Sequence, residues 1–499
     1  LDGGPIFALA ALALACKPKP KQVLSAFPRY PHRRSASKPK TRNTQPKTRN
    51  PKPTTHNPKP TTQNPRPAMP QAAAATTDTP STRALAASCA EAARKVARLD
   101  AATKNRVLQA MADRLGDHED AIMTANEKDV DAAEADGRSP ALIDRLRLSP
   151  ARIAAMADAL REVAGFEDPV GRMADVRRRP SGIEVGRMRI PLGVIAMVYE
   201  ARPNVTADAA GLCFKAGNAV ILRGGSDAFR SNHAVADALH EALAAHDLPP
   251  AAVTLLPTTD RAAITELIQC DEHVDLVIPR GGEGLIRFVD ENSRVPVIKH
   301  YKGVCHLYVD CAADLDLATD LLVDGKCSRP AVCNALETLL VHEAVAEDFL
   351  PMAHRALASE GVELRGCERT RALLDGVAPA TEDDYHTEFL DRILAVRVVD
   401  DYDAATAHIT QYGSNHTEVI ATNDLPTARR FTREVDASVV LVNASSRFSD
   451  GGQLGLGAEI GISTTKLHAY GPMGLDALTT QKFVVTGQGE TRHPVPPRS

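Results

Sequence analysis

The pattern of apolar and polar positions changes several times along the chain. From Arg83 to about Val163, apolar residues recur at helical spacing, and Leu99-Asp100-Ala101-Ala102 is typical of a helix cap followed by a helix. Residues 176–189 form short polar runs around Pro180-Ser181-Gly182, a pattern that indicates a β-hairpin. The sequence therefore predicts a helical segment and then a small arm able to pair across a subunit boundary.

Beyond Pro191, short apolar runs alternate with ten or more residues of helical pattern. Strand–helix–strand units of this spacing predict a parallel, doubly wound sheet. Its expected strands are Gly193–Tyr199, Ala219–Arg223, Val253–Leu256 and Val274–Ile278. Because open α/β sheets bind ligands beyond the carboxyl ends of their strands, the loops after these strands should converge on one crevice. These loops are Glu200–Asn204, Arg223–Asp227 and Pro279–Gly284.

A second α/β alternation follows, so the whole body of the chain is expected to be of the α/β class. Its expected strands are Val304–Asp310, Leu336–His342, Arg392–Val399, Thr417–Ala421 and Val439–Val442. With 499 residues, the chain exceeds the size at which a single core stops growing, so two or three domains are expected.

The N-terminal residues differ in composition from the rest. Residues 17–82 are rich in Pro, Thr, Lys, Arg and Asn, with a seven-residue repeat beginning at Asn50, Asn57 and Asn64. Such a segment buries too little apolar surface to fold, which predicts a disordered or polyproline-like extension. Residues 1–82 carry 14 Lys and Arg against 2 acidic residues. This basic tail could touch nucleic acid or membrane, but a solvated tail is the favoured interpretation.

The remaining residues carry 45 Lys and Arg against 61 acidic residues. This acidic body argues against nucleic acid or an anionic membrane as a partner. The nearest approach to a membrane span is Ile6–Cys16, which is too short and lacks the preceding basic residues of a secretory signal. The nine cysteines form neither an even framework nor a CxxC pair, so we expect reduced thiols, a cytoplasmic location and no structural metal.

The candidate nucleophile is Cys333, in the run SRPAVCNALET at residues 328–338. The following residues, Asn334-Ala335-Leu336-Glu337, favour a helix, so Cys333 is expected near a helix start, where free N–H groups lower a thiol pKa. The competing interpretation is an inert, buried cysteine.

Two glycine-rich runs are candidates for phosphate binding. Arg280-Gly281-Gly282-Glu283-Gly284 follows a predicted strand and offers backbone N–H groups before a helix, although an ordinary glycine turn explains it equally well. Gly455-Leu456-Gly457 with Gly461 has the wrong spacing and context for a dinucleotide fingerprint. No ATP-binding GxxxxGK[ST] loop is present in the sequence. Among the histidines, His300 and His306 flank a lysine-bearing loop and are at most supporting groups.

Several long runs, taken together, resemble the gamma-glutamyl phosphate reductase (glutamate-5-semialdehyde dehydrogenase) family, a branch of the aldehyde dehydrogenase superfamily. The resemblance is colinear over residues 83–489. It rests on residues 199–228, 273–286, 295–310, 328–342, 411–420 and 435–489, which include YEARPNVTADAAGLCFKAGNAVILRGGSDA, HVDLVIPRGGEGLI and SRPAVCNALETLLVH.

The resemblance implies NADPH-dependent reduction of glutamyl 5-phosphate to glutamate 5-semialdehyde in proline biosynthesis, with a functional link to glutamate 5-kinase. It also implies an aldehyde-dehydrogenase-like fold. The expected parts are a cofactor-binding domain at 83–304, a catalytic domain at 305–445, and a return segment with an oligomerisation strand at 446–499. The 176–189 hairpin and the strand Lys482–Thr486 would support a homo-oligomer.

The resemblance also assigns roles to residues. Cys333 matches the catalytic cysteine, and Asn204 matches the asparagine that binds the oxyanion. The positions matched to the cofactor's ribose and phosphates are Arg223 and Glu388. The predicted cofactor site is completed by Gly224 and Gly225 beside Arg223, and by Gly281 and Gly282 of the glycine-rich run described above. The cations expected near the substrate's carboxylate or phosphate are Arg329, Lys299, His300 and Lys302.

The chain departs from the family pattern at Ala331, Lys302, Tyr470 and Cys327, which puts the local shape and charge of the substrate pocket in question. The stretch where hydrolytic aldehyde dehydrogenases carry a glutamate base reads Lys299-His300-Tyr301-Lys302-Gly303, which favours phosphate over water as the partner of the acyl group. Two alternatives stay open: a general NAD(P)-dependent aldehyde dehydrogenase, and an inactive homologue that acts as a binding module.

Overall fold

The computed structural model describes residues 80–493, and its first part is helical. Asp100 caps α2, because its carboxylate accepts a hydrogen bond from the Thr103 N–H at 2.7 Å. The helix predicted after Asp100 is therefore confirmed. The predicted basic extension up to residue 79, with its apolar run and repeats, lies outside the described residues. The helices of this part are α1 (Thr82–Val96), α2 (Ala101–Asp117), α3 (Glu119–Ala135), α4 (Pro140–Leu146) and α5 (Pro150–Gly165).

The predicted parallel sheet is present, with four strands in the order β5-β4-β3-β6 and parallel pairing throughout. Its strands are β3 (Val194–Tyr199), β4 (Ala219–Arg223), β5 (Val253–Leu255) and β6 (Leu276–Arg280). Every residue of β3 is buried. Ile195, Met197 and Tyr199 face one core, and the residues between them face another. Both faces of the sheet are therefore covered, as a doubly wound sheet requires.

Most helices of this part contribute to one core only. Side chains of α2, α3, α5, α6 and α7 pack in the first core and those of α8 and α9 in the second, whereas α1 contributes to both. The helices that follow the strands are α6 (Asn204–Lys215), α7 (Phe229–Ala244), α8 (Arg261–Ile268) and α9 (Glu283–Asn292). Among all helices between residues 80 and 493, none has both the length and the apolar character needed to cross a membrane.

The strand predicted at 274–278 lies two residues further on, at Leu276–Arg280. Val274 N–H bonds to the carbonyl of Cys270 and so belongs to the preceding turn. The Asp275 carboxylate accepts a hydrogen bond from the Val194 N–H at 2.8 Å, which fixes the start of the neighbouring strand instead. As a consequence, Arg280 ends a strand rather than opening a loop.

The second predicted alternation forms a seven-stranded parallel sheet in the order β10-β9-β11-β8-β7-β12-β13. Strands β9 and β10, which the sequence pattern did not reveal, extend one edge. The strands are β7 (Cys305–Val309), β8 (Leu336–His342), β9 (Glu363–Gly366), β10 (Ala378–Pro379), β11 (Ile393–Val399), β12 (Thr417–Ala421) and β13 (Val439–Val442). The helices are α10 (Leu315–Cys327), α11 (Glu343–Ser359), α12 (Glu368–Leu373), α13 (Glu382–Tyr385), α14 (Tyr402–Tyr412) and α15 (Leu425–Glu434).

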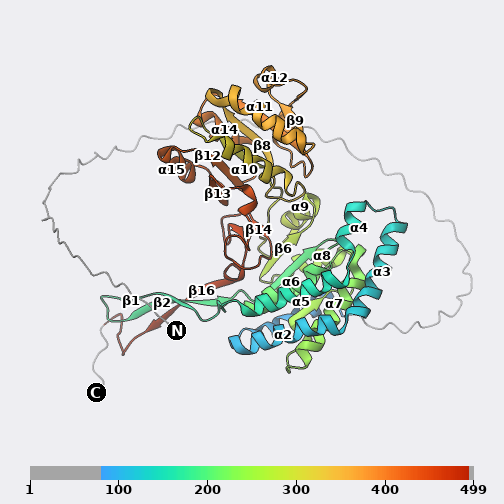
Figure 1. Ribbon diagram of the computed structural model, residues 1–499. Helices are drawn as coiled ribbons and strands as arrows, with labels where there is room; N and C mark the ends of the chain where they lie inside the picture. Colours follow the sequence, from blue (N-terminus) through green and yellow to red (C-terminus); the bar gives the residue numbers. More distant parts are fainter. Residues whose placement is uncertain (1–79, 494–499) are drawn as a thin grey trace, which may run out of the picture. The chain divides into compact units, whose positions relative to one another are not determined.

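The predicted hairpin arm is confirmed and gains a third strand from the end of the chain. Strand β1 (Met173–Arg178) pairs antiparallel with β2 (Glu184–Pro191), and β16 (Thr479–Thr486) pairs with the other edge of β2. Figure 1 shows β16 running beside β2 along its length, although nearly 300 residues separate them in sequence. A short ladder of β14 (Ile462–Ser463) and β15 (Gly471–Pro472) precedes β16.

Candidate active site

Cys333 lies in a turn that leads from α10 into β8, so the predicted position at a helix start is wrong. The Ala335 N–H bonds to the Val332 carbonyl, and the chain enters the sheet at Leu336. The helix-favouring residues 334–337 become strand because β8 pairs with β7 and β11 and six of its seven side chains are buried. Tertiary pairing here outweighs local helix propensity.

Gly303, just before β7, and Cys305, its first residue, pack against the main-chain carbonyl of Cys333. A Cβ added to Gly303 would overlap the Cys333 carbonyl oxygen and would lie 2.7 Å from its carbonyl carbon. The Cys305 thiol donates a hydrogen bond to the same oxygen over 3.2 Å. The carbonyl of Cys333 is therefore held in place, and only glycine fits at position 303.

The surroundings of Cys333 raise its thiol pKa to about 11, mainly through burial. Arg280 is the charge that opposes this rise, whereas Glu388 and Glu459 add to it. The expected lowering of the pKa by a helix start is thus also corrected. In the free protein Cys333 is a thiol near neutral pH, and it needs a nearby positive charge to become a nucleophile.

The first residue of α6 is Asn204, and its amide Nδ2 donates to the Asp208 carboxylate over 2.8 Å. Burial raises the pKa of Asp208 to about 6. Within residues 80–493 the Asn204 side chain has no hydrogen bond to Cys333. Two residues earlier, desolvation lowers the pKa of Arg202, and the thiolate charge of Cys333 opposes this effect.

Arg202, Arg280 and Glu459 are the groups near Cys333 that the sequence did not single out for roles in catalysis. Arg202 stands in the first of the three loops expected to converge, and Arg280 opens the glycine-rich run. The position of these two arginines in loops predicted to bind a ligand was the sequence signal that could have identified them. Glu459 accepts a hydrogen bond from the Gly451 N–H at 2.9 Å, and burial raises its pKa.

The glycine-rich run after β6 has the geometry of an anion cradle. Gly282 is the residue that precedes α9, and its N–H donates to the Glu200 carboxylate over 3.0 Å. A Cβ added to Gly281 would lie 2.7 Å from the Glu200 carboxyl carbon. A carboxylate thus stands where this cradle would hold a phosphate oxygen, which fits the predicted role of Gly281 and Gly282.

Arg223 is held at the end of β4. Its Nη2 donates to the Thr259 carbonyl over 2.6 Å and its Nη1 to the Gly224 carbonyl over 3.1 Å, while its buried Nε has no partner among residues 80–493. A Cβ added to the neighbouring Gly225 would lie 3.4 Å from the Glu200 Cα. One buried donor therefore remains for a ligand at this strand end.

Glu388, the last of the predicted cofactor residues, lies near the turn that carries Cys333, which we call the nucleophile turn. The Glu388 carboxylate accepts a hydrogen bond from the Gly303 N–H at 2.9 Å, and burial raises its pKa. Glu388 therefore lies next to the main chain that supports Cys333.

The predicted substrate cations have different fates. Lys299 forms an ion pair with Asp290, and Lys302 donates to the His386 carbonyl over 2.6 Å. Burial lowers the pKa of His300 to about 4, with Arg280 as the next cause, so the expectation that His300 is a cation is wrong near neutral pH. Arg329 is exposed at the start of the nucleophile turn.

His306 is a structural residue rather than a ligand of the site. Its Nδ1 lies 2.9 Å from the Glu418 carboxylate, and both side chains are buried in the seven-stranded sheet.

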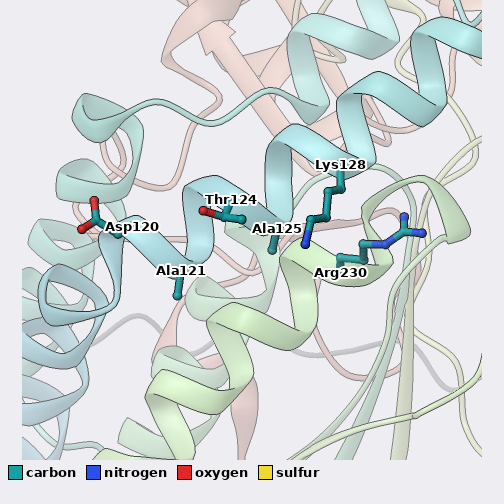
Figure 2. Close-up of a pocket in the computed structure, with 6 residues that line it drawn as sticks. All are labelled: Asp120, Ala121, Thr124, Ala125, Lys128 and Arg230. Carbon is teal, nitrogen blue, oxygen red and sulfur yellow. The ribbon is translucent and has the colours of Figure 1, made fainter.

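One surface groove is separate from this chemistry. It has a volume of about 520 Å³ and lies between α3 and α7. Figure 2 shows Lys128 of α3 and Arg230 of α7 at one end of it. None of the predicted site residues lines this groove.

Comparisons with known proteins agree with this fold. Residues 51–363 match the aldehyde dehydrogenase family. The gamma-glutamyl phosphate reductase of Salinibacter ruber is 71% identical over 420 residues, which are 84% of this chain and 96% of that protein. The Xanthomonas axonopodis pv. citri protein of the same name is 60% identical over 82% of this chain and 99% of its own length.

Solved structures give the same result. The crystal structure of gamma-glutamyl phosphate reductase from Thermotoga maritima matches with a TM-score of 0.82 and 45% identity, covering 83% of this chain and 100% of that one. An acetylating aldehyde dehydrogenase from Geobacillus thermoglucosidasius shares the fold, with a TM-score of 0.60, 16% identity and coverage of 83% and 98%. The chain therefore belongs to the gamma-glutamyl phosphate reductase family, within the aldehyde dehydrogenases.

Proposed function

We propose that the chain is a phosphorylating, NADP-dependent glutamate-5-semialdehyde dehydrogenase that reduces L-glutamyl 5-phosphate to L-glutamate 5-semialdehyde and releases phosphate, a step of proline biosynthesis. The observation that carries this proposal is the 71% identity to a gamma-glutamyl phosphate reductase over nearly the whole of that protein. The close packing of Gly303 against the main chain of Cys333 supports it. A functional link to glutamate 5-kinase follows, because an enzyme of that type makes the acyl phosphate.

Cys333 is the proposed nucleophile. Its thiolate attacks the acyl carbon, the bond from that carbon to the phosphate oxygen breaks, and its electron pair leaves with phosphate, so that a thioester remains. The Cys333 N–H and the Asn204 amide are the proposed donors to the oxyanion; loss of one such donor typically costs about 10²–10³ in rate. The Asn204 Nδ2 carries two N–H groups and donates one of them to Asp208 in this structure, so the other remains for the oxyanion.

The proposed cofactor residues fit a nicotinamide dinucleotide. Gly224, Gly225, Gly281 and Gly282 let backbone approach the pyrophosphate, and the Arg223 Nε is a buried donor without a partner among residues 80–493. Glu200 must leave the glycine cradle for a phosphate to enter it. NADPH, when bound, supplies the hydride that reduces the thioester carbon. Glu388, proposed for the ribose, also supports Gly303 through its hydrogen bond.

Arg329 is the proposed partner of the substrate's α-carboxylate, because it is exposed at the edge of the nucleophile turn. Lys299 and His300 are proposed to shape the substrate side of the pocket. The charge of Lys299 is balanced by Asp290, and the neutral ring of His300 is a hydrogen-bonding group.

We further propose a homo-oligomer that pairs through the arm, and a cytoplasmic location. The two outer strands of the arm, β1 and β16, have free edges within residues 80–493. The eight cysteines in the same range are all free, as expected in a reducing compartment.

Phosphate-dependent oxidation of glutamate 5-semialdehyde tests the proposal, with NADP⁺ and NAD⁺ compared on the full chain and on a chain beginning at residue 80. We expect oxidation to require phosphate and to be faster with NADP⁺. Equal rates without phosphate, with free glutamate as product, would instead support the general aldehyde dehydrogenase. No turnover with either cofactor would support the inactive homologue.

The Cys333→Ala variant tests the nucleophile in the same assay. It should abolish NADPH oxidation with glutamyl phosphate and retain NADPH binding, measured by fluorescence. Cys311→Ala is the matched control, because Cys311 is exposed and lies outside the nucleophile turn. Full turnover by Cys333→Ala would move the nucleophile to Cys327.

A further inference from the structure

Two guanidinium groups within electrostatic reach of Cys333, those of Arg202 and Arg280, have no partner among the residues that the structure describes. Twenty-five ion pairs are present among residues 80–493, and neither Arg202 nor Arg280 takes part in any of them. Their side chains also make no hydrogen bond within this range. By contrast, Lys299 and Lys302, the cations expected at the site, are both engaged by the protein. Arg202 and Arg280 are thus free positive charges near the nucleophile, as is the exposed Arg329 at the start of its turn.

The sheet places these arginines at one edge. Tyr199 of β3 and Arg280 of β6 are opposite each other in adjacent parallel strands, and the Glu200 N–H donates to the Arg280 carbonyl over 3.2 Å. Arg202 follows β3 by three residues. Both arginines therefore project from the carboxyl ends of neighbouring strands, where open α/β sheets bind ligands.

The return segment, residues 446–499, packs against the Arg280 guanidinium through Gly461. A Cβ added to Gly461 would lie 2.9 Å from Arg280 Nη1 and 3.3 Å from its Cζ. The next residue, Ile462, contacts the His300 ring through its backbone. Arg280 is therefore packed against main chain, which fixes its guanidinium without neutralising it.

The charges at this place favour an anion. Partial desolvation and the positive charge of Arg280 lower the pKa of Arg202, although its side chain keeps an exposed surface. The charges of Arg145 and Arg329 lower this pKa further, and the thiolate of Cys333 opposes these effects. Glu459 and Glu388 are the carboxylates within electrostatic reach of Cys333, and each already accepts a backbone hydrogen bond. Glu459 also lies within electrostatic reach of Arg280, but it forms no ion pair with it. Two neighbouring arginines that form no ion pair are an arrangement that binds a phosphate by paired hydrogen bonds.

We propose that Arg202 and Arg280 hold the phosphate of the acyl-phosphate substrate beside Cys333. This inference rests on the proposed function. In an acyl phosphate, one oxygen joins the phosphorus to the carbon that the thiolate attacks, so the phosphate site must adjoin the sulfur. The two guanidinium groups then stabilise the negative charge that leaves with the phosphate when the carbon–oxygen bond breaks. The same positive charges favour the thiolate of Cys333 in the substrate complex.

The test uses inorganic phosphate and the full chain. Alkylation of Cys333 by iodoacetamide is followed by peptide-resolved mass spectrometry at increasing phosphate, with ionic strength held constant by KCl. Each variant is normalised to its own rate without phosphate. We expect phosphate to protect Cys333 in the wild type, and Arg202→Gln and Arg280→Gln each to raise the half-protecting concentration about 10-fold or more.

Lys128→Gln is the matched control for loss of one positive charge, because Lys128 lies in the separate groove on α3 (Figure 2). It should leave protection unchanged. Arg202→Lys and Arg280→Lys keep the charge without the planar fork, and should show intermediate shifts. Thermal melting checks that all variants fold. If a glutamine variant does not fold, the corresponding lysine variant is used in its place.

A second readout separates phosphate from cofactor and from the proposed function. In semialdehyde oxidation, both glutamine variants should raise the KM for phosphate about 10-fold and leave the Kd of NADP⁺ unchanged. A raised Kd of NADP⁺ with unchanged phosphate dependence would assign the pair to the cofactor and overturn the proposal, as would a phosphate shift in only one variant. Phosphate protection through both arginines without any semialdehyde oxidation would refute the proposed function alone.

Discussion

Lys326 and Glu337 form an ion pair of 2.6 Å between two completely buried side chains. The second oxygen of the Glu337 carboxylate accepts a hydrogen bond from the Leu390 N–H at 3.2 Å. Leu390 has a φ of 55°, an unfavourable value for a leucine. The pair therefore holds the segment that carries Glu388, which in turn bonds to Gly303 behind the nucleophile.

Glu337→Gln should lower the free energy of unfolding by about 3–5 kcal/mol, because it leaves the buried Lys326 charge without its partner. The measurement is urea unfolding followed by circular dichroism. Turnover should fall as well, since the support of Glu388 and Gly303 is loosened.

Glu434→Gln is the matched control for the loss of an ion pair. Arg430 and Glu434 pair at 2.9 Å on an exposed helix face, where such a pair contributes less than about 1 kcal/mol. If Glu337→Gln cost no more than Glu434→Gln, the buried pair would have no special role in holding the site.

The pH dependence of Cys333 alkylation follows from its environment. Burial raises the pKa of this thiol to about 11, so only a small fraction is thiolate at pH 7 in the free protein. The alkylation rate of Cys333 should therefore keep rising with pH beyond pH 9, without an earlier plateau. Arg280→Gln removes the charge that favours the thiolate, and should move the rise to higher pH. A plateau below pH 8 in the wild type would show that the resting thiol is already activated.

Gly303→Ala should reduce turnover about 10²-fold, because the added Cβ displaces the Cys333 carbonyl and misplaces the nucleophile. NADP⁺ binding should persist, which separates this effect from unfolding. Gly116→Ala is the matched control: it lies in α2 with nothing within 4 Å of the added Cβ, so it should keep full turnover. Normal turnover of Gly303→Ala would mean that the segment before β7 does not position Cys333.

Much of this fold was predictable because buried parallel strands appear in sequence as short apolar runs. Strands β3, β4, β7 and β12 all lie within a residue of their predicted bounds. The family assignment is confirmed by the 71% identical relative. Strands β9 and β10 were missed because they are short, with few apolar residues to signal them.

The site was less predictable, for two physical reasons. Residues 334–337 favour a helix locally, but pairing of β8 with its neighbours makes them strand, and only the three-dimensional sheet shows this. The charge of a side chain also depends on partners distant in sequence. Asp290 balances Lys299 and burial neutralises His300, whereas Arg202 and Arg280 stay unpaired within residues 80–493.

The proposed assembly through the arm gives the last prediction. Phe483 and Val485 of β16 are 66% and 57% exposed, and β16 is an edge strand of the arm. Exposed apolar side chains on an unpaired edge favour association with another sheet edge. Phe483→Ser with Val485→Ser should therefore shift the protein toward monomers in sedimentation velocity, with the dissociation constant raised at least about 10-fold. Leu425→Ser is the matched control, since Leu425 is 58% exposed on α15. An unchanged oligomer in the double variant, or an equal shift in the control, would place the subunit contact away from the arm.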